Sequence, residues 1–595
     1  MSPITSARDE RSPGTQEKMS TPRTASVNGL RGIEILHDPR LNKSTAFTEA
    51  EREALGLVGL VPDVTESMET QLDRVLKQLD TKSTDLERFI HLMNLLGTNE
   101  RLFYRTLMSD PARFLYIVYD PTIAEACLKY DQIFRRAQGM YLSITRKGHV
   151  REVLRSWPVK DVRVICVTNG GRILGLGDLG ANGIGIPIGK LQLYTAAAAV
   201  PPEGLLPMYL DAGTNNEDCL KDSLYVGLRR RRPPTEELYA FVDEFVEAVQ
   251  DVFPNCCIHF EDWTGADAIA LLARYRNRVC CYNDDIQGTA GVVLAGLINA
   301  LKITGGQLKD QKILFLGAGS AAIGLADLFV SALGQQGVAT DVARQQVRMF
   351  DTKGLVVAGR PGLEPHKRPY AHNLPPSKPF NHLDPASECP QILAAIEDFK
   401  PTAVIGVSGN AVPADAGRLF SREIVEAMAR LNARPIIFAL SNPIDKHECL
   451  PDDAYEWTKG KAVYAGGVQF PPVHLDGKTF LPSQANNLYI FPAVGMAIYA
   501  TNAKRVTDEM FIEAAHAVAD QVTPEQLTLG MLFPPQSNIL ETEIKTAARV
   551  AKMVFDSNLA CVEQPADYEA FIRRHTYDPA YPNLVSAEPK VMQRE

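Results

Sequence analysis

Two pairs of acidic residues follow short apolar stretches that have the composition of buried strands. Glu261-Asp262 comes after Cys257-Ile258-His259-Phe260, and Asp284-Asp285 follows residues 279–282. Carboxylate oxygens are preferred ligands of Mg²⁺ and Mn²⁺, and α/β sheets bind ligands at the carboxyl ends of their strands. Acids in such places are often helix caps, but two pairs on neighbouring strands favour a divalent-metal site. No His/Cys set has zinc spacing.

A glycine-rich turn follows the next apolar run. Gly317-Ala318-Gly319-Ser320-Ala321-Ala322 comes after residues 312–316 and opens an apolar, helix-like segment. This is the context that a G-x-G-x-x-G/A fingerprint for a dinucleotide requires. Gly317 would permit the tight turn, Gly319 would let the backbone approach the pyrophosphate, and Ala322 would keep the helix close to the sheet. The helix N-terminus, with Ser320 and Ala321, would bind the pyrophosphate. The alternative is a glycine turn in a sheet that binds nothing.

The residues after the following strand bear on the choice of nucleotide. Asp351 ends that strand and could bind the adenine ribose, which favours NAD, although it lies farther from Gly319 than is usual. Lys367 and Arg368 come a short loop later and could bind a 2′-phosphate, which favours NADP. The balance favours NADP slightly, with NAD as the alternative; a solvated loop is the other interpretation of the basic residues.

Lys190 closes an uncharged, glycine-rich run over residues 183–189. A lysine in such a run and near a cation is expected to have a lowered pKa, so it could act as a neutral base near pH 7. The alternative is an ordinary surface lysine.

Bulk composition limits the class of protein. A chain of 595 residues is too long for one core, and 45% hydrophobic with 22% charged residues is typical of a soluble globular protein. The net charge of −9 argues against nucleic acid as a partner. The basic run Arg229-Arg230-Arg231-Arg232 is interpreted as a solvated loop, with an anion or partner patch as the alternative. The ten cysteines form no C-x-x-C pair, so we expect buried thiols and a reducing compartment.

Neither a membrane span nor a targeting segment is expected. The longest uncharged apolar stretch, residues 286–301, is shorter than the ~18 residues that a transmembrane helix needs. The first 28 residues mix acidic and basic side chains, unlike a mitochondrial presequence, and are interpreted as a disordered tail. These features favour the cytoplasm, with the mitochondrial matrix as the alternative.

The order of predicted elements indicates an α/β fold. Residues 45–135 are predicted to be helical, with capping boxes at Thr48-x-x-Glu51 and Thr84-x-x-Glu87. Strands and helices alternate over 138–285 and again from residue 312, as in a doubly wound parallel sheet. Helices are expected to return after residue 487, and 355–390 is predicted to be loop. Strands of the second region are predicted at residues 312–316, 347–350, 402–407 and 435–440.

Taken together, these segments resemble the malic enzymes of the large eukaryotic type. The resemblance extends over almost the whole chain, apart from the first ~28 residues and the last few. Its motifs are DPRLNK at 38–43, AFT at 46–48, YDPT at 119–122, RILGLGDLG at 172–180, GK at 189–190, FED at 260–262, NDDIQGT at 283–289, FLGAG at 315–319, ALSNP at 439–443 and QANNLYIFP at 484–492.

The resemblance implies a role for each matching residue. Glu261, Asp262 and Asp285 would hold Mn²⁺ or Mg²⁺. Malate would complete the coordination shell of the ion through its C1 carboxylate and C2 hydroxyl. Lys190, paired with Asp284, would be the general base, and Tyr119 the general acid. Arg172 would bind a substrate carboxylate, and Asn442 and Asn487 would contact the substrate and the nicotinamide side. The implied reaction converts L-malate and NAD(P)⁺ to pyruvate, CO₂ and NAD(P)H.

The resemblance also implies an architecture and a partner. A Rossmann domain would be inserted in a central α/β domain, with a helical N-terminal domain, and the chain would form a homodimer or homotetramer. The expected domains are a tail (1–28), the N-terminal domain (29–137), the central domain (138–285 and 487–558), the Rossmann domain (286–486) and a C-terminal arm (559–595).

Two alternative functions remain, and the sequence departs from the family pattern at three places. A malolactic-type enzyme would make lactate and retain its nucleotide, and a non-catalytic sensor of malate or nucleotide would lack turnover. Residues 465–470 differ from the Ser-Gly-Ser-Pro-Phe segment of many relatives, and 410–417 are interpreted as a short insertion. Thr98 stands where fumarate-activated members have arginine, which argues against fumarate activation although Arg74 is present.

Overall fold

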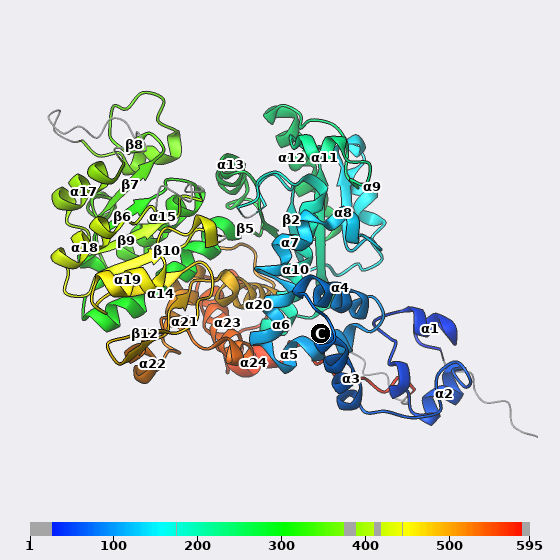
Figure 1. Cartoon of the computed structure of the whole chain (residues 1–595). Coiled ribbons are helices and arrows are strands. Elements are labelled where there is room, and N and C mark those ends of the chain that lie inside the picture. The colour runs from blue at the N-terminus through cyan, green and yellow to red at the C-terminus, as the bar shows by residue number, and fades with distance from the viewer. Residues whose placement is uncertain (1–25, 174, 374–387, 410–417, 443, 586–595) are drawn as a thin grey trace, which may run out of the picture. The chain divides into compact units, whose positions relative to one another are not determined.

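The structure is a computed structural model of the whole chain (Figure 1). It describes residues 26–173, 175–373, 388–409, 418–442 and 444–585. Most of the expected tail and the expected insertion at 410–417 lie outside these residues. The chain divides into two compact units. Unit 1 comprises Met1–Thr81, Met93–Arg105 and Pro579–Glu595, and unit 2 comprises Lys82–Leu92 and Thr106–Asp578.

The N-terminal part is helical, as the sequence predicts. Both expected capping boxes form, since Glu51 N binds Thr48 Oγ1 at 3.3 Å and Glu87 N binds Thr84 Oγ1 at 3.2 Å. The helices are α1 (Ile33–His37), α2 (Glu49–Leu55), α3 (Met68–Asp80), α4 (Asp85–Leu96), α5 (Glu100–Ser109), α6 (Pro111–Val118), α7 (Thr122–Leu128) and α8 (Tyr130–Ile133).

Within unit 1, residues near the C-terminus pack on the first helices. The Tyr581 hydroxyl donates to Gln71 Oε1 at 2.6 Å and accepts from Asn99 Nδ2 at 2.6 Å. Leu584 N donates to the buried Glu51 carboxylate, which also binds Lys43 Nζ at 2.5 Å. Segments from the two ends of the chain therefore share one set of polar contacts.

The first sheet of unit 2 is parallel and has five strands in the order β1-β3-β2-β4-β5. Central strand β2 is buried along its length, because helices cover both faces. One face packs on α9, α12 and α13, and α10 covers the other. The strands are β1 (Met140–Ser143), β2 (Val164–Thr168), β3 (Leu205–Asp211), β4 (Cys257–Phe260) and β5 (Cys281–Asn283). The helices are α9 (Val150–Arg155), α10 (Gly185–Ala198), α11 (Glu217–Lys221), α12 (Thr235–Val252) and α13 (Gly265–Tyr275).

The glycine-rich run before Lys190 forms part of helix α10. Every residue of α10 is buried, and Lys190 is its single charged residue. A helix that is apolar on all sides belongs in a core, so Lys190 is held inside the protein. The interpretation of Lys190 as an ordinary surface lysine is therefore wrong.

The second sheet has the order β14-β11-β10-β9-β6-β7-β8, and all its pairs are parallel except β7 with β8. Helices α17, α18 and α19 pack on one face, and α14 and α15 lie on the other (Figure 1). The predicted doubly wound sheet is confirmed. The strands are β6 (Ile313–Leu316), β7 (Val347–Asp351), β8 (Gly354–Leu355), β9 (Ala403–Gly406), β10 (Ile436–Ala439), β11 (Val463–Gly466) and β14 (Ser483–Gln484). The helices are α14 (Thr289–Thr304), α15 (Ser320–Gln335), α16 (Thr340–Gln345), α17 (Glu388–Phe399), α18 (Arg422–Leu431) and α19 (Pro451–Trp457).

The expected loop at 355–390 is partly ordered structure. Gly354–Leu355 is the antiparallel edge strand β8, and Pro365–Tyr370 forms a 3-10 turn. Residues 374–387 lie outside the described residues. Beyond the second sheet, β12 (Val473–Leu475) and β13 (Lys478–Phe480) form a small antiparallel hairpin.

Helices return after the second sheet, as predicted. They are α20 (Phe491–Thr501), α21 (Asp508–Ala519), α22 (Pro524–Thr528), α23 (Ile539–Asp556) and α24 (Tyr568–Arg574). Among the described residues, Asp284–Thr304 is long and apolar enough to cross a membrane, but 78% of its most apolar window is buried inside the protein. This is the behaviour of a core helix. The boundaries expected for the five domains stay predictions.

Candidate metal centre and active site

Three acidic side chains converge at the ends of neighbouring strands. Glu261 and Asp262 follow β4, Asp285 follows β5, and Phe260 pairs with Asn283 in the register of these strands. One oxygen from each of the three carboxylates can be chosen so that all lie within 4.8 Å of one another. Burial raises the pKa of both Glu261 and Asp285, and the neighbouring carboxylates add to it, although Lys190 acts in the opposite direction. Clustered buried carboxylates repel one another, so a divalent cation with oxygen ligands fits this set.

The backbone at Asp262 is held in a left-handed turn with φ +54°. Its N–H donates to Asp285 Oδ2 at 2.9 Å, and its carbonyl accepts from Arg172 N at 3.2 Å. Left-handed backbone is uncommon outside glycine and often marks functional sites. The turn thus connects two of the acids with the residue expected to bind a substrate carboxylate.

Lys190 lies beside these acids. Its Nζ is 2.5 Å from Asp284 Oδ2 and 3.1 Å from Glu261 Oε1. Burial alone would lower the pKa of Lys190, but the charges of Asp284 and Glu261 outweigh it, and the pKa is raised well above its ordinary value. The protein's own groups therefore act against the lowered pKa that the sequence predicted for Lys190. That prediction assumed a nearby cation, whereas here the carboxylates dominate the local field.

Asp284 belongs to a π-helical turn, Asp284–Gly288, that precedes α14. Such turns often occur at functional sites. A Cβ on Gly288 would lie 1.8 Å from Asp284 Oδ1, so glycine leaves room for this carboxylate. Asn487 Nδ2 donates to Asp284 Oδ2 at 3.0 Å and to Thr289 Oγ1 at 3.0 Å. The structure thus brings Asn487 to the Lys190–Asp284 pair, where its amide is already bonded.

Tyr119 follows the last residue of α6 and lies against Lys190. The Lys190 Nζ is 5.3 Å from the centre of the Tyr119 ring, and a Cβ on Gly189 would lie 3.0 Å from Tyr119 Cδ2. Burial raises the pKa of Tyr119 well above its ordinary value, although Lys190 acts in the opposite direction. Tyr119 therefore keeps its proton, as a general acid must before it reacts.

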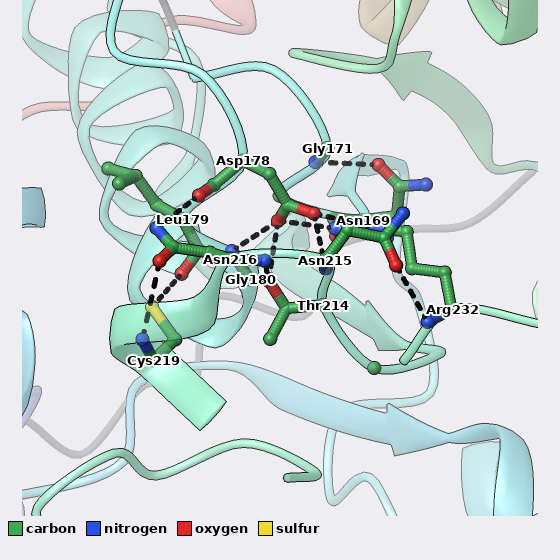
Figure 2. Close-up of polar contacts among 12 residues, drawn as sticks. Asn169, Gly171, Asp178, Leu179, Gly180, Thr214, Asn215, Asn216, Cys219 and Arg232 are labelled. Carbon is green, nitrogen blue, oxygen red and sulfur yellow. Dashed lines mark hydrogen bonds and ion pairs between the residues drawn. The ribbon is translucent and has the colours of Figure 1, made fainter. Parts of the chain in front are cut away.

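Arg172 belongs to the loop after β2, and Figure 2 shows the partly buried ion pair between Asp178 and Arg232 that holds this loop. The Arg172 side chain is exposed, and no acidic side chain among the described residues pairs with its guanidinium. Farther along the loop, Asp178 binds Arg232 Nε and Nη2 at 3.0 and 2.8 Å. Asp178 also accepts from Thr214 Oγ1 at 2.8 Å, and Arg232 donates to Asn169 O at 2.9 Å.

The basic run 229–232 is thus only partly the solvated loop that the sequence predicted. Arg231 is exposed, but the Arg232 side chain is 9% exposed and binds Asp178. Long-range pairing with a loop that lies 54 residues earlier in the chain removes Arg232 from solvent. Because all four residues of the run are arginine, the sequence did not indicate that Arg232 would be less exposed than Arg231.

The predicted dinucleotide turn lies at the switch point of the second sheet, between β6 and β9. Gly317 has φ +122°, and a Cβ there would lie 2.5 Å from Val407 O, so glycine is required. A Cβ on Gly319 would meet no atom within 4 Å, so the space beside this residue is open. Ser320, Ala321 and Ala322 begin α15. Within α15, Gly324 also lies close to another backbone segment, because a Cβ there would be 2.7 Å from Ile286 O, a position that the fingerprint did not indicate.

Asp351 at the end of β7 is neutralised by two basic side chains. Arg360 binds both its oxygens, and Lys367 Nζ lies 2.9 Å from Oδ2. Despite burial, these hydrogen bonds keep the pKa of Asp351 below its ordinary value. Lys367 is buried, whereas Arg368 is exposed. Arg368 borders a cavity of about 350 Å³ that is also lined by Ala358, Gly359, Arg360, Gly362, Leu363 and Ala371.

Asn442 follows β10, next to a buried carboxyl group that the sequence analysis missed. Glu448 accepts from Ser441 Oγ at 2.5 Å, from Ser441 N at 3.2 Å and from Ser408 N at 3.2 Å. Glu448 thereby holds together the loops after β9 and β10. Asn442 Oδ1 is buried and has no hydrogen-bond partner among the described residues.

His259 is a second residue that the sequence analysis missed, because it lies in an apolar strand. Its Nε2 lies 2.8 Å from Glu261 Oε2, and Tyr194 and Tyr282 face its other nitrogen. Burial lowers the pKa of His259 to about 3, so the ring is neutral. The alternation of side chains along β4 would have placed His259 and Glu261 on one face.

Comparisons with known proteins agree with this geometry. The family model described as "Malic enzyme, N-terminal domain" matches residues 96–276, and "Malic enzyme, NAD binding domain" matches residues 286–555. The chain is 44% identical over 571 residues to an NADP-dependent malic enzyme of Phaseolus vulgaris, covering 95% of this chain and 94% of that one. It is 43% identical over 558 residues to an NADP-dependent malic enzyme of Homo sapiens, covering 93% and 94%.

A solved structure shares the fold. The crystal structure of Entamoeba histolytica malic enzyme matches with a TM-score of 0.53 at 22% identity, over 78% of this chain and 80% of that one. The fold, the family matches and the clustered acids therefore agree, and the chain belongs to the malic enzyme family, the NAD(P)-dependent enzymes that oxidise and decarboxylate malate.

Proposed function

We propose that this chain converts L-malate to pyruvate and CO₂ with NADP⁺, using Mn²⁺ or Mg²⁺ held by Glu261, Asp262 and Asp285. The observation that carries the proposal is the convergence of these three carboxylates beside the buried Lys190–Asp284 pair. When bound, the cation and the nicotinamide ring would supply a Lewis acid and a hydride acceptor. The remaining steps belong to side chains of the protein.

Lys190 is the base that removes the proton from the C2 hydroxyl of malate, a role that requires the charge of the bound cation to offset Asp284 and Glu261, which otherwise raise the pKa of Lys190. Its Nζ is held by Asp284 and Glu261 and is shielded from solvent, since Lys190 is 2% exposed. Tyr119 is the acid that protonates C3 after CO₂ leaves, because its buried hydroxyl keeps its proton and its ring lies against Lys190. A proton can then pass between the two residues.

Arg172 and two asparagines orient the substrate. The exposed guanidinium of Arg172 can bind a carboxylate through two parallel hydrogen bonds. Asn487 donates to Asp284 Oδ2 and so holds that carboxylate beside Lys190, and its contact with the substrate is assigned from the family resemblance. Asn442, at the end of β10, is assigned to the nicotinamide side, and its loop is fixed by Glu448.

NADP is favoured over NAD by the environment of Asp351. A free carboxylate at that position would repel a 2′-phosphate, but Arg360 and Lys367 already neutralise it. Arg368 remains exposed beside the cavity and can pair with the phosphate. The two relatives named above are both NADP-dependent, which supports the same choice.

The test measures free NADPH and pyruvate from malate with Mn²⁺, in parallel with NAD⁺. Equal amounts of NADPH, pyruvate and CO₂ are expected. Lactate formed without free NAD(P)H would instead identify a malolactic-type enzyme, and saturable malate binding without turnover would identify a sensor. We further propose a cytoplasmic homodimer or homotetramer, which light scattering and fractionation of the source cells would test.

A further inference from the structure

A buried chain of hydrogen bonds ends on Glu261. His259 Nε2 lies 2.8 Å from Glu261 Oε2, and His259 Nδ1 lies 2.9 Å from the Tyr194 hydroxyl and 3.0 Å from the Tyr282 hydroxyl. The two hydroxyls also hydrogen-bond to each other. His259, Tyr194 and Tyr282 are each 0% exposed, so bulk water does not compete for these contacts.

The direction of the chain follows from the chemistry of its last acceptor. A carboxylate that holds a metal ion is ionised and only accepts hydrogen bonds, so with Glu261 in that role His259 Nε2 carries a hydrogen and donates it. In the neutral ring Nδ1 is then an acceptor, which takes a hydrogen from one tyrosine while the second tyrosine donates to the first. Every donor in the chain therefore points toward Glu261.

The three side chains come from elements that fix their positions. His259 and Tyr282 are register partners on β4 and β5, and their ring centres are 4.6 Å apart. Tyr194 projects from α10, the helix that carries Lys190. The ring centre of Phe491, in α20, is 5.9 Å from that of His259. Groups held on strands and helices are more precisely placed than groups on loops.

We propose that His259 is a positioning residue for the metal site: it holds Glu261 Oε2 so that Oε1 serves the site shared with Lys190, while Tyr194 and Tyr282 fix the histidine tautomer. The inference rests on the proposed function, because Glu261 is there a metal ligand. Partners of this kind orient a ligand and raise its basicity, and their removal typically lowers metal affinity about 10- to 100-fold.

The test measures the dissociation constant of Mn²⁺ for the full-length protein, from the electron paramagnetic resonance signal of the free ion. His259→Leu removes the donor, and we expect its dissociation constant to rise about 10- to 100-fold. His259→Gln keeps an N–H of similar reach and should stay within about threefold of the wild type. The affinity for NADP⁺ should be unchanged in both variants. His372→Gln is the matched control, since His372 is also buried but binds Val347 O at 2.8 Å in the second sheet.

The outcomes separate the inference from the proposed function. If the wild type has no saturable Mn²⁺ site, both fail. If the wild type binds Mn²⁺ and His259→Leu binds it equally well, only the role of His259 fails. Equal losses in His259→Leu and His259→Gln would assign the effect to packing and overturn the proposal. Should His259→Leu not fold, Tyr282→Phe combined with Tyr194→Phe tests the same chain; a rise of about three- to tenfold supports it, and an unchanged constant overturns it.

Discussion

Arg232 binds both carboxylate oxygens of Asp178, at 2.8 and 3.0 Å, although the two residues lie 54 positions apart. The same carboxylate accepts from Asn215 N at 2.9 Å, and Asn216 Nδ2 donates to the Asp178 carbonyl at 2.7 Å (Figure 2). The pair therefore ties the loop after β2, which carries Arg172, to the loop after β3. Since Arg172 is exposed, its position depends on the rigidity of its loop.

The first prediction concerns this pair. Arg232→Lys should lower kcat/KM for malate roughly 10- to 100-fold, because lysine cannot form the two-pronged contact and small misplacements of substrate groups have effects of this size. The binding constant of NADP⁺ should not change. Steady-state kinetics with Arg231→Lys as control, a neighbour whose side chain is 65% exposed, would check it. An unchanged kcat/KM for malate in a folded Arg232→Lys variant would show that the loop needs no such support.

Loss of the base should separate chemistry from nucleotide binding. Lys190→Ala should reduce malate oxidation by at least about 10²–10⁴-fold, the usual contribution of general acid–base catalysis. NADP⁺ affinity, measured by fluorescence titration, should stay near the wild-type value, because the dinucleotide turn belongs to the second sheet. The exposed Lys309 provides the control variant Lys309→Ala. Normal turnover in Lys190→Ala would remove this lysine from its assigned role.

Removal of one acid should weaken metal binding. Asp285→Ala takes away one of three converging carboxylates, so the Mn²⁺ concentration for half-maximal activity should rise by more than about 100-fold, beyond the effect typical of an outer partner. Exhaustive chelation should abolish activity in the wild type, and added Mn²⁺ should restore it. Glu247→Ala changes an exposed acid and should leave the titration curve in place. A curve for Asp285→Ala that overlies the wild type would exclude Asp285 as a ligand.

The fold was predictable because its strands are short apolar runs that end at glycine or acidic residues. The run at 312–316 became β6, and the glycines after it form the switch-point turn. The acids after β4 and β5 were recognisable for the same reason, since parallel strands direct their carboxyl ends to one edge of a sheet. Local sequence therefore sufficed for the positions of Glu261, Asp262 and Asp285.

The interior partners were not predictable, because they depend on contacts between distant segments. His259 was interpreted as part of an apolar strand, and Arg232 as one member of a solvated basic run. Asp351 was interpreted as a residue that could bind the adenine ribose, and its ion pairs with Arg360 and Lys367 were not foreseen. For Lys190, the direction of the pKa depends on the carboxylates of Glu261 and Asp284, which follow β4 and β5.

Nucleotide choice should depend on Arg368. Arg368→Gln removes an exposed guanidinium next to the cavity beside Asp351, so KM for NADP⁺ should rise about 10- to 100-fold, as expected for a lost charge-assisted hydrogen bond. KM for NAD⁺, which has no 2′-phosphate, should change little. Initial rates with both nucleotides would measure the ratio, with Arg430→Gln, a change at a largely exposed arginine of α18, as control. An equal change for NAD⁺ and NADP⁺ would contradict a phosphate contact.

The last prediction concerns stability and pH. Burial raises the pKa of Asp120, next to Tyr119, from 3.8 to about 6, although Lys190 acts in the opposite direction. The folded state then binds this proton more tightly than the unfolded state, so the contribution of Asp120 to stability falls as pH rises through that range. Asp120→Asn has no charge to bury. Because the side chain keeps partial contact with solvent, its advantage over the wild type should grow by roughly 1–3 kcal/mol between about pH 4 and pH 7.5.

Thermal unfolding of both proteins across this pH range measures the difference in stability between Asp120→Asn and the wild type. The contributions of the other titrating groups cancel in this difference, because both proteins contain them. Asp341→Asn is the control, since it makes the same substitution at a side chain that is 98% exposed. If the difference between Asp120→Asn and the wild type were instead constant with pH, Asp120 would have the same pKa in the folded and unfolded states. The acid next to Tyr119 would then be solvated, and the pocket around the proposed general acid would be more open to water than the structure indicates.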